Sequence, residues 1–169
     1  TKKNLSTFQK GNLLHIYYYA KSDNSVGNIR CSLFQNYSNK IFNDLIRLNV
    51  INSVCSLLSL LPEKEVNTNF YLKTKFLFTS LTDKNFLKEY SFWELDFLFA
   101  LGFGLDFSKC AFTETVENLE FVSPKSGRAI SKNAALPWKN KLLELPSFLI
   151  DKKINPSLFE IKKALYLTG

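Results

Sequence analysis

The 169-residue sequence contains no methionine, a single histidine and only three cysteines. Because no initiating methionine is present and residues 164–169 look like a helix cut soon after it begins, we expect the chain to be a fragment that lacks its natural start and end. His15 lies in a predicted strand, where a lone histidine is usually a surface or structural residue rather than a catalytic base. Cys31, Cys55 and Cys110 are odd in number and widely spaced. This spacing argues against a disulfide framework or a zinc knuckle and favours a reducing compartment.

Long hydrophobic runs are also missing. The longest apolar stretch, residues 90–103, contains Glu94 and Asp96 and is too short to cross a bilayer. No signal peptide is visible at the start of the chain. We therefore expect no membrane partner.

The sequence lacks the patterns that carry catalysis. No Gly-x-Ser-x-Gly, His-Glu-x-x-His or P-loop pattern occurs. Glu94 and Asp96 are two positions apart on a predicted helix, so their carboxylates point to different faces and cannot act as a pair. Residues 123–128 have some likeness to a phosphate-binding loop but lack the lysine–hydroxyl pair that opens a helix, which favours a hairpin tip. We predict a protein that is not an enzyme and uses no cofactor.

Positive charge is what the sequence has in excess, with a net charge of +7. Residues 1–50 hold seven basic and two acidic side chains, residues 51–120 six and ten, and residues 121–169 nine and three. Two basic ends therefore flank a slightly acidic middle. This distribution suits a polyanionic partner, of which nucleic acid is the commonest, and a generic basic surface is the alternative.

The first part of the chain predicts two strands. Residues 13–19 and 29–34 are rich in aromatic and branched side chains, and a polar turn cluster at 21–28 separates them. Two strands alone are marginal in water. We expect them to pair with further strands or to pack on a helix.

Three helices are predicted next. Apolar residues recur at steps of three and four over residues 41–61, which predicts an amphipathic helix ended by Pro62. Thr68 or Asn69 could cap a second helix that runs to about residue 81, and Asp83 a third that runs to residue 101. The third helix is apolar around nearly its whole circumference, which indicates burial on most sides.

Beyond this third helix the pattern changes. Gly102 fits a left-handed C-terminal cap, and no helical period follows it up to residue 136. Residues 119–122 and 128–131 predict a small hairpin with its turn at 123–127. A brief helix is expected from Pro146, and Asn155 should cap the last helix, with Pro156 as its first residue. Together these elements predict an α+β fold, a mainly helical domain with a small β insertion.

A basic set around this hairpin is the candidate binding site. Its members are Lys125, Arg128, Lys132, Trp138, Lys139 and Lys141, and no acidic residue lies between them. Cations with an interleaved aromatic suit a surface that follows a phosphate backbone and stacks an unpaired base. The alternative is a solvated loop whose tryptophan packs on the core. The neighbouring pairs at 152–153 and 162–163 are expected to lie on a solvated helix face.

The order of several motifs resembles the RecO family of bacterial DNA repair and recombination mediators. The matching segments are residues 94–106, 108–111, 121–129, 143–149 and 164–169, together with residues 11–12 before the first strand and 60–63 after the first long helix. The resemblance implies an oligonucleotide-binding (OB) β-barrel followed by a helical domain with a zinc-finger-like insertion. Residues 1–36 would be the last part of the barrel, and residues 37–169 the helical domain, with its insertion at about 106–137. The opening strands of the barrel would precede Thr1, and a final helix would follow Gly169.

Some members of this family bind zinc through two Cys-x-x-Cys pairs in the insertion. Here the first pair corresponds to Cys110 and Thr113, and the second aligns with Ser131 and Ala134. One thiolate cannot form a tetrahedral zinc site, so we predict that no metal is bound and that Cys110 is a lone remnant. The insertion should instead be held together by Phe112, Leu119, Phe121 and Ile130.

The resemblance also implies a function. The family's members are non-enzymatic mediators that bind single- and double-stranded DNA, anneal complementary strands and help to load RecA onto DNA coated by the single-stranded-DNA-binding protein. The implied partners are DNA, RecR and the acidic C-terminal tail of that coating protein, in a cytoplasmic, nucleoid-associated location. The alternative is a protein-interaction adaptor that binds the tail or RecR and holds DNA poorly. A metal-dependent nuclease is disfavoured because the acidic residues are scattered.

Overall fold

The structure is a computed structural model that describes residues 7–22, 25–62 and 65–169. The chain divides into two compact units. One comprises residues 1–66 and 78–83, and the other comprises residues 67–77 and 84–169. Helices and small antiparallel sheets occur together in the chain, so the predicted mixture of helix and strand is confirmed.

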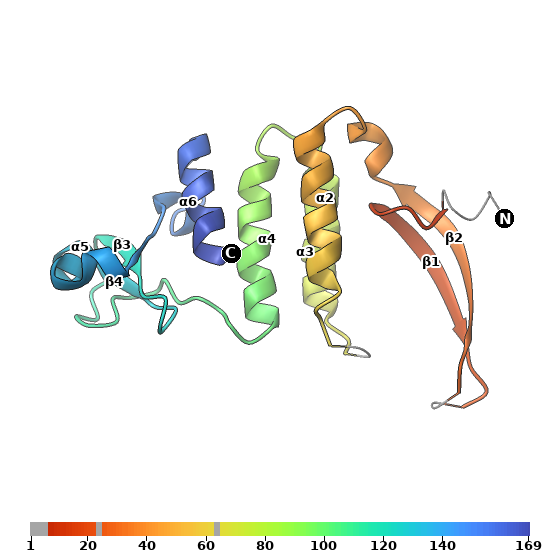
Figure 1. Cartoon of the computed structure of the whole chain (residues 1–169), viewed down its shortest axis with the longest axis horizontal. Coiled ribbons are helices and arrows are strands. Elements are labelled where there is room, and N and C mark those ends of the chain that lie inside the picture. Colours follow the sequence, from red (N-terminus) through yellow and green to blue (C-terminus); the bar gives the residue numbers. More distant parts are fainter. Residues whose placement is uncertain (1–6, 23–24, 63–64) are drawn as a thin grey trace. The chain divides into compact units, whose positions relative to one another are not determined.

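The first unit contains a long antiparallel hairpin. Strand β1 (Asn12–Tyr19) pairs with β2 (Asn28–Asn36), with Ile16 opposite Cys31 and an irregularity between Leu13 and Leu14. Figure 1 shows the two strands as one twisted ribbon. Both strands were predicted, and each is longer than predicted. Part of the predicted turn at 21–28, residues 23–24, lies outside the described residues. The OB barrel remains a prediction.

The helix predicted at 41–61 begins later and ends earlier than its apolar period indicates. A short 3-10 helix, η1 (Ser38–Ile41), comes first, and α2 runs over Leu45–Leu58. The Asp44 carboxylate accepts hydrogen bonds from the N–H groups of Ile46 and Arg47, each at 3.1 Å. This side-chain cap fixes the start of the helix. The helix also ends before Pro62, so the prediction that proline stops it is wrong.

The next helices, α3 (Thr68–Ser80) and α4 (Phe86–Ala100), lie close to their predicted positions, but their predicted caps are wrong. The Asn67 side chain accepts from the N–H of Phe70 at 2.9 Å, in place of Thr68 or Asn69. Helix α4 follows Asn85 instead of being capped by Asp83. Only Phe99 is exposed among the residues of α4, so the prediction of burial on most sides holds for the rest.

Helix α4 ends in the left-handed cap that the sequence predicts. Gly102 has φ +85°, and its N–H donates to the Phe99 carbonyl at 3.0 Å. The N–H of Phe103 reaches back to the Leu98 carbonyl at 2.8 Å. These two bonds form a Schellman motif, which satisfies carbonyls that a helix end otherwise leaves without partners. The chain leaves α4 through this turn and enters the insertion.

The insertion is built on a three-stranded antiparallel sheet in the order β4-β3-β5. Strands β3 (Leu119–Val122) and β4 (Ala129–Ser131) form the predicted hairpin, whereas the third strand, β5 (Leu143–Glu144), was not predicted. Between β4 and β5 lie α5 (Lys132–Ala135) and the 3-10 helix η2 (Leu136–Lys141). The sheet therefore extends beyond the predicted boundary of about 137, because residues after η2 return to pair with β3.

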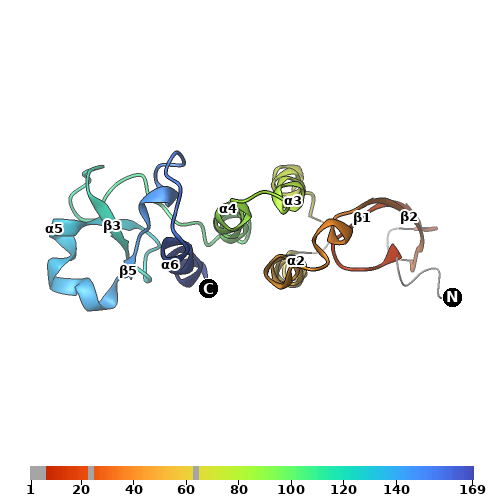
Figure 2. The ribbon, with the colours of Figure 1, turned by 90° about the horizontal axis from the view of Figure 1, so that it is seen from above.

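The last helix, α6 (Leu158–Thr168), follows the short 3-10 helix η3 (Ser147–Leu149). Its cap is Ser157, not Asn155. The Ser157 hydroxyl and the Glu160 carboxylate each bind the other's backbone N–H in a capping box. In Figures 1 and 2, α6 lies between α4 and the sheet, and its Thr168 hydroxyl donates to the Glu94 carboxylate.

One apolar core joins the sheet, η3 and α6. Its members are Cys110, Leu119, Phe121, Val122, Ala129, Ile130, Ala135, Leu145, Phe148, Leu149, Ile161, Ala164 and Leu167. Three of the four residues predicted to hold the insertion are among them. The fourth, Phe112, is 64% exposed, so that part of the prediction is wrong. The insertion has no core of its own and depends on side chains from α6 and η3.

Candidate nucleic-acid interface

The six predicted site residues all lie in the second unit, on consecutive elements of the insertion. Lys125 is exposed in the β3–β4 turn, Arg128 precedes β4, Lys132 opens α5, and the other three lie on η2. The turn is closed by hydrogen bonds from the Gly127 N–H to the Ser123 carbonyl at 2.8 Å and from the Ser123 N–H to the Arg128 carbonyl at 3.0 Å. The sequence therefore presents its cations on a fixed hairpin and on the short helices that follow it.

Two of the predicted cations lie near carboxylates of residues that come earlier in the chain than the basic set. Arg128 Nε lies 3.7 Å from Asp106, and Lys132 Nζ lies 3.2 Å from Glu120. Asp106 is held there by its backbone, since its N–H donates to the Gly127 carbonyl and its carbonyl accepts from the Ala129 N–H. Hydrogen bonds from Ser108, and then the nearby Arg128, lower the pKa of Asp106. These carboxylates offset part of the positive charge.

The remaining cations are available to a ligand. Lys125, Lys139 and Lys141 form no ion pair with any described residue. Lys141 Nζ lies 5.7 Å from the centre of the Trp138 ring, and Trp138 is 52% exposed. The tryptophan therefore presents ring surface to solvent next to a cation, which is the arrangement that stacks an unpaired base beside its phosphate.

Thr113 and Ser131, two residues aligned with the cysteine pairs of the resembled family, lie beside the Cys110 thiol. Cys110 is fully buried, and its sulfur accepts from the Ser131 N–H at 3.3 Å. Burial raises the pKa of Cys110, but hydrogen bonds from Thr113, from the Ser131 hydroxyl and N–H, and from the Phe112 N–H outweigh it and lower the pKa to about 6. Over the described residues, no three histidine, cysteine or acidic side chains gather as metal ligands would. One thiol surrounded by hydroxyl and amide donors does not fit zinc.

The lowered pKa of Cys110 predicts a pH dependence of stability. A thiol that ionises more readily when folded stabilises the folded state above its unfolded pKa of about 8.5. That stability falls as the pH decreases and is lost through pH 6. Urea unfolding should therefore show a larger free energy of unfolding for the wild-type protein at pH 8.5 than at pH 5.5. The Cys110→Ala variant should lose this difference in stability. Thr113→Val removes a hydrogen bond that lowers the pKa of Cys110, so the loss of stability should begin at a higher pH. A Cys110→Ala variant with the wild-type pH dependence would contradict the assignment.

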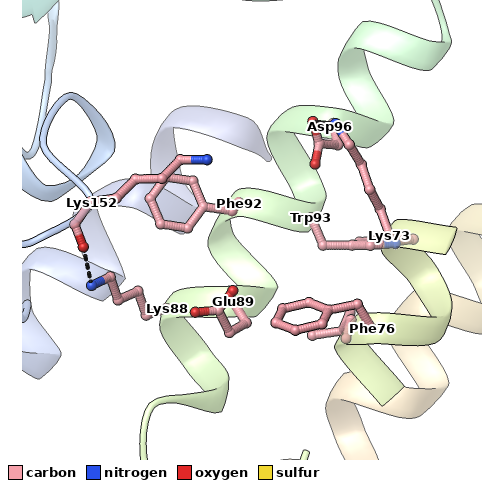
Figure 3. Close-up of a pocket in the computed structure, with 9 residues that line it drawn as sticks. Lys73, Phe76, Lys88, Glu89, Phe92, Trp93, Asp96 and Lys152 are labelled. Carbon is pink, nitrogen blue, oxygen red and sulfur yellow. Dashed lines mark hydrogen bonds and ion pairs between the residues drawn. The ribbon is translucent and has the colours of Figure 1, made fainter. Parts of the chain in front are cut away.

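A separate groove in the second unit combines cations with aromatic rings (Figure 3). Helices α3 and α4 and the loop before α6 form it, and its volume is about 220 Å³. Its lining residues are Lys73, Phe76, Leu77, Lys88, Glu89, Phe92, Trp93, Asp96 and Lys152. The sequence did not identify this groove, because its residues come from three separate segments.

Only one of the groove's three lysines is free for a ligand. Lys73 pairs with Asp96, and Lys88 donates to the carbonyls of Lys152 and Ile154, each at 2.8 Å. The Lys152 ammonium lies 5.1 Å from the centre of the Phe92 ring and forms no ion pair with any described residue. Lys152 belongs to a pair that the sequence assigned to a solvated helix face, whereas it lies in a loop against an aromatic ring.

Comparison with known proteins identifies relatives along the whole chain. The family model described as "Recombination protein O C terminal" matches residues 43–165. The DNA repair protein RecO of Rickettsia canadensis is 36% identical over 170 residues, which covers all of this chain and 70% of the relative. Those of Rickettsia bellii and Orientia tsutsugamushi are 34% and 35% identical, again over the whole chain and 70% and 71% of the relative. No solved structure matches. No helix among the described residues is long and apolar enough to cross a membrane.

Proposed function

Because the chain belongs to the RecO family, we propose that it acts in DNA repair and recombination as a mediator without enzymatic activity. It binds single- and double-stranded DNA, anneals complementary strands and helps to load RecA onto DNA coated by the single-stranded-DNA-binding protein, in association with RecR. The observation that supports the DNA-binding part is the exposed Trp138 with Lys141 beside it, on an insertion whose Lys125, Lys139 and Lys141 form no ion pair with any described residue.

The physical basis is charge neutralisation. Two DNA strands repel each other, and lysines that neutralise phosphates on both strands lower that repulsion while they release condensed counterions. An exposed aromatic ring stacks on bases of any sequence. A basic surface with one aromatic platform can therefore hold an unpaired strand without sequence preference and leave its remaining bases free to pair.

The proposal predicts strongly salt-dependent binding to a single-stranded oligonucleotide. The logarithm of the affinity should fall by about 0.7 per tenfold increase in salt for each phosphate neutralised on a single strand. Fluorescence anisotropy with a labelled oligo-dT between 50 and 300 mM salt measures this slope. An affinity that does not change with salt would exclude the basic surface as the DNA contact.

The groove beside Phe92 suits the acidic tail of the single-stranded-DNA-binding protein. A tail that ends in an apolar residue needs a cation beside an apolar pocket. Phe76 and Phe92 supply the apolar surface, Trp93 is buried beneath it, and Lys152 supplies a cation without an acidic partner. The peptide's last side chain would lie against the rings and its carboxylates near Lys152.

Replacing Lys152 tests the groove. Lys152→Gln should weaken binding of an acidic tail peptide by about ten- to 150-fold, since a hydrogen bond to a charged group contributes about 1.5–3 kcal/mol. The neighbouring Lys153 is exposed and does not line the groove, so Lys153→Gln is the matched control. Equal losses in both variants, measured by isothermal titration calorimetry, would indicate a general charge effect instead of a peptide site.

The same groove favours the second candidate function, an adaptor that binds the tail and holds DNA poorly. Binding of oligonucleotide and of tail peptide to the same preparation separates the two. The mediator binds both ligands, and replacing its insertion lysines weakens only DNA binding. The adaptor binds the peptide alone.

A further inference from the structure

We propose that α6 carries a second contact surface for a single nucleic-acid strand, formed by a stripe in which two aromatic side chains flank two basic ones. The stripe consists of Phe159, Lys162, Lys163 and Tyr166. The proposal rests on the proposed function, because it assigns another part of the chain to the same class of ligand. From the sequence alone, Lys162 and Lys163 were predicted to lie on a solvated helix face.

The stripe follows from helical geometry. Positions i, i+3, i+4 and i+7 lie on one face of a helix, so the two rings lie about 10 Å apart along the axis with both lysines between them. Phe159 is 66% exposed and Tyr166 is 75% exposed. The opposite face of α6 buries Ile161, Ala164 and Leu167 in the core. The stripe therefore faces away from the core. It exposes two aromatic rings, whereas the solvent side of a helix usually carries polar side chains.

The stripe borders a shallow groove with the end of the insertion. Leu142, Leu143 and Glu144 form the other side of this groove. The chain enters it directly from Lys141, the last residue of η2. The groove therefore continues from the segment that carries Trp138, and a strand bound at Trp138 can extend along it.

The charges of the groove complement a polyanion. Lys163 pairs with Glu144 and lies 4.4 Å from the centre of the Phe159 ring. Lys162 forms no ion pair with any described residue. With Lys141 at its entrance, the groove has three cations and one carboxylate. The net charge of the groove is therefore positive, and two aromatic rings lie beside it. A nucleic-acid strand offers phosphates to the cations and bases to the rings.

The shape of the groove favours nucleic acid over an acidic peptide. A peptide with an apolar end needs a pocket that encloses that side chain, as the groove over the buried Trp93 can. Phe159 and Tyr166 instead stand open to solvent. Exposed ring faces enclose little, but they offer the flat contact on which a base stacks.

Photocrosslinking tests the proposal directly. An oligo-dT in which 5-iodouracil replaces some thymines crosslinks under ultraviolet light to aromatic side chains that it contacts, and mass spectrometry of the digested chain locates the bonds. We expect crosslinks at Phe159 or Tyr166 in addition to Trp138. Crosslinks at Trp138 alone would overturn the α6 surface and leave the proposed function intact. Absence of any oligonucleotide binding would overturn both.

Variants supply an independent measurement of affinity. Phe159→Ala with Tyr166→Ala should weaken oligo-dT binding at least fivefold, and up to about a hundredfold for each stacked base that is lost. Phe103→Ala is the matched control, because Phe103 is 71% exposed and lies outside the stripe. Lys162→Gln should reduce the salt slope by about 0.7, and adding Lys163→Gln should reduce it further by less than that, because Glu144 already offsets Lys163. Lys153→Gln should leave the slope unchanged.

The outcomes decide between ligand classes. Loss of acidic-peptide binding with unchanged oligonucleotide binding would assign the stripe to a protein partner and overturn the proposal. Unchanged binding of both ligands overturns it as well. Because the four side chains lie outside the core, the variants should unfold at the wild-type temperature. The crosslinking result decides the matter for wild-type protein even if they do not.

Discussion

Replacing Lys125, Lys139 and Lys141 together by glutamine should weaken binding of single-stranded DNA about a hundredfold at 0.1 M salt. Each phosphate contact on a single strand contributes about 0.7 to the salt slope, and hence about 0.7 log units of affinity at 0.1 M salt. Three contacts therefore contribute about two log units. The slope itself should fall by about 2.1. Fluorescence anisotropy at several salt concentrations measures both quantities.

The matched control removes the same charge elsewhere. Lys21, Lys84 and Lys153 are exposed and lie outside the insertion and both grooves. Their triple glutamine variant should change affinity only slightly. The pair Arg128→Gln and Lys132→Gln should also cost less per residue than the first set, because Asp106 and Glu120 already offset these cations. An equal loss in the control triple would mean that net charge, and not this surface, determines DNA binding.

The ion pairs of Arg128 and Lys132 show what the sequence pattern could not reveal about this surface. A run of cations without an acidic residue is visible in the sequence, and it predicts a binding surface on the insertion. The acidic partners come from 12 and 22 positions earlier in the chain, respectively, for Lys132 and Arg128. Only the strand pairing of the insertion brings them close. Because a lone pattern does not record tertiary neighbours, the sequence overestimated two of the six residues as free cations.

The fold was predictable where local rules act alone. The Gly102 cap, the β3–β4 hairpin and the two strands of the first unit depend on short-range geometry, and all occur where they were predicted, with strand ends that differ by one or two residues. Helix boundaries were less predictable, since the apolar period at 41–61 continues past both ends of α2. Capping by Asp44 decides where that helix starts. Strand β5 was not predictable, because two residues carry too little pattern to reveal a strand.

The grooves show a different limit. Lys152 and Phe92 are sixty positions apart, yet their side chains form one cation–ring contact. A pair of neighbouring lysines is typical of a solvated helix face by composition alone, but the pairs at 152–153 and 162–163 each have one lysine against an aromatic ring. The positive charges are therefore visible in the sequence. Their contacts with aromatic rings are not, because the fold brings each ring to its lysine.

Phe148→Ala should destabilise the second unit by about 3–5 kcal/mol, the usual cost of truncating a buried phenylalanine. Phe148 is fully buried in the core that joins the sheet to α6, and its ring meets Phe92 of α4 edge-on at 5.9 Å between centres. A loss of this size is a large fraction of the total stability of a typical domain, which is about 5–15 kcal/mol. Urea unfolding followed by circular dichroism measures it.

The same experiment decides whether the insertion is an independent module. Since its sheet shares one core with α6 and η3, the insertion and the helices should unfold in a single transition. In a Trp93→Phe variant the fluorescence of Trp138 reports on the insertion and far-UV circular dichroism reports on the helices, so the two midpoints of this one variant should coincide, and Phe148→Ala should lower both. The control is Phe112→Ala, the same substitution at an exposed position of the insertion, which should cost no more than about 0.5 kcal/mol. If Phe148→Ala shifted only the Trp138 transition, the insertion would fold separately, and the proposed DNA-binding surface would not be held rigidly against α6.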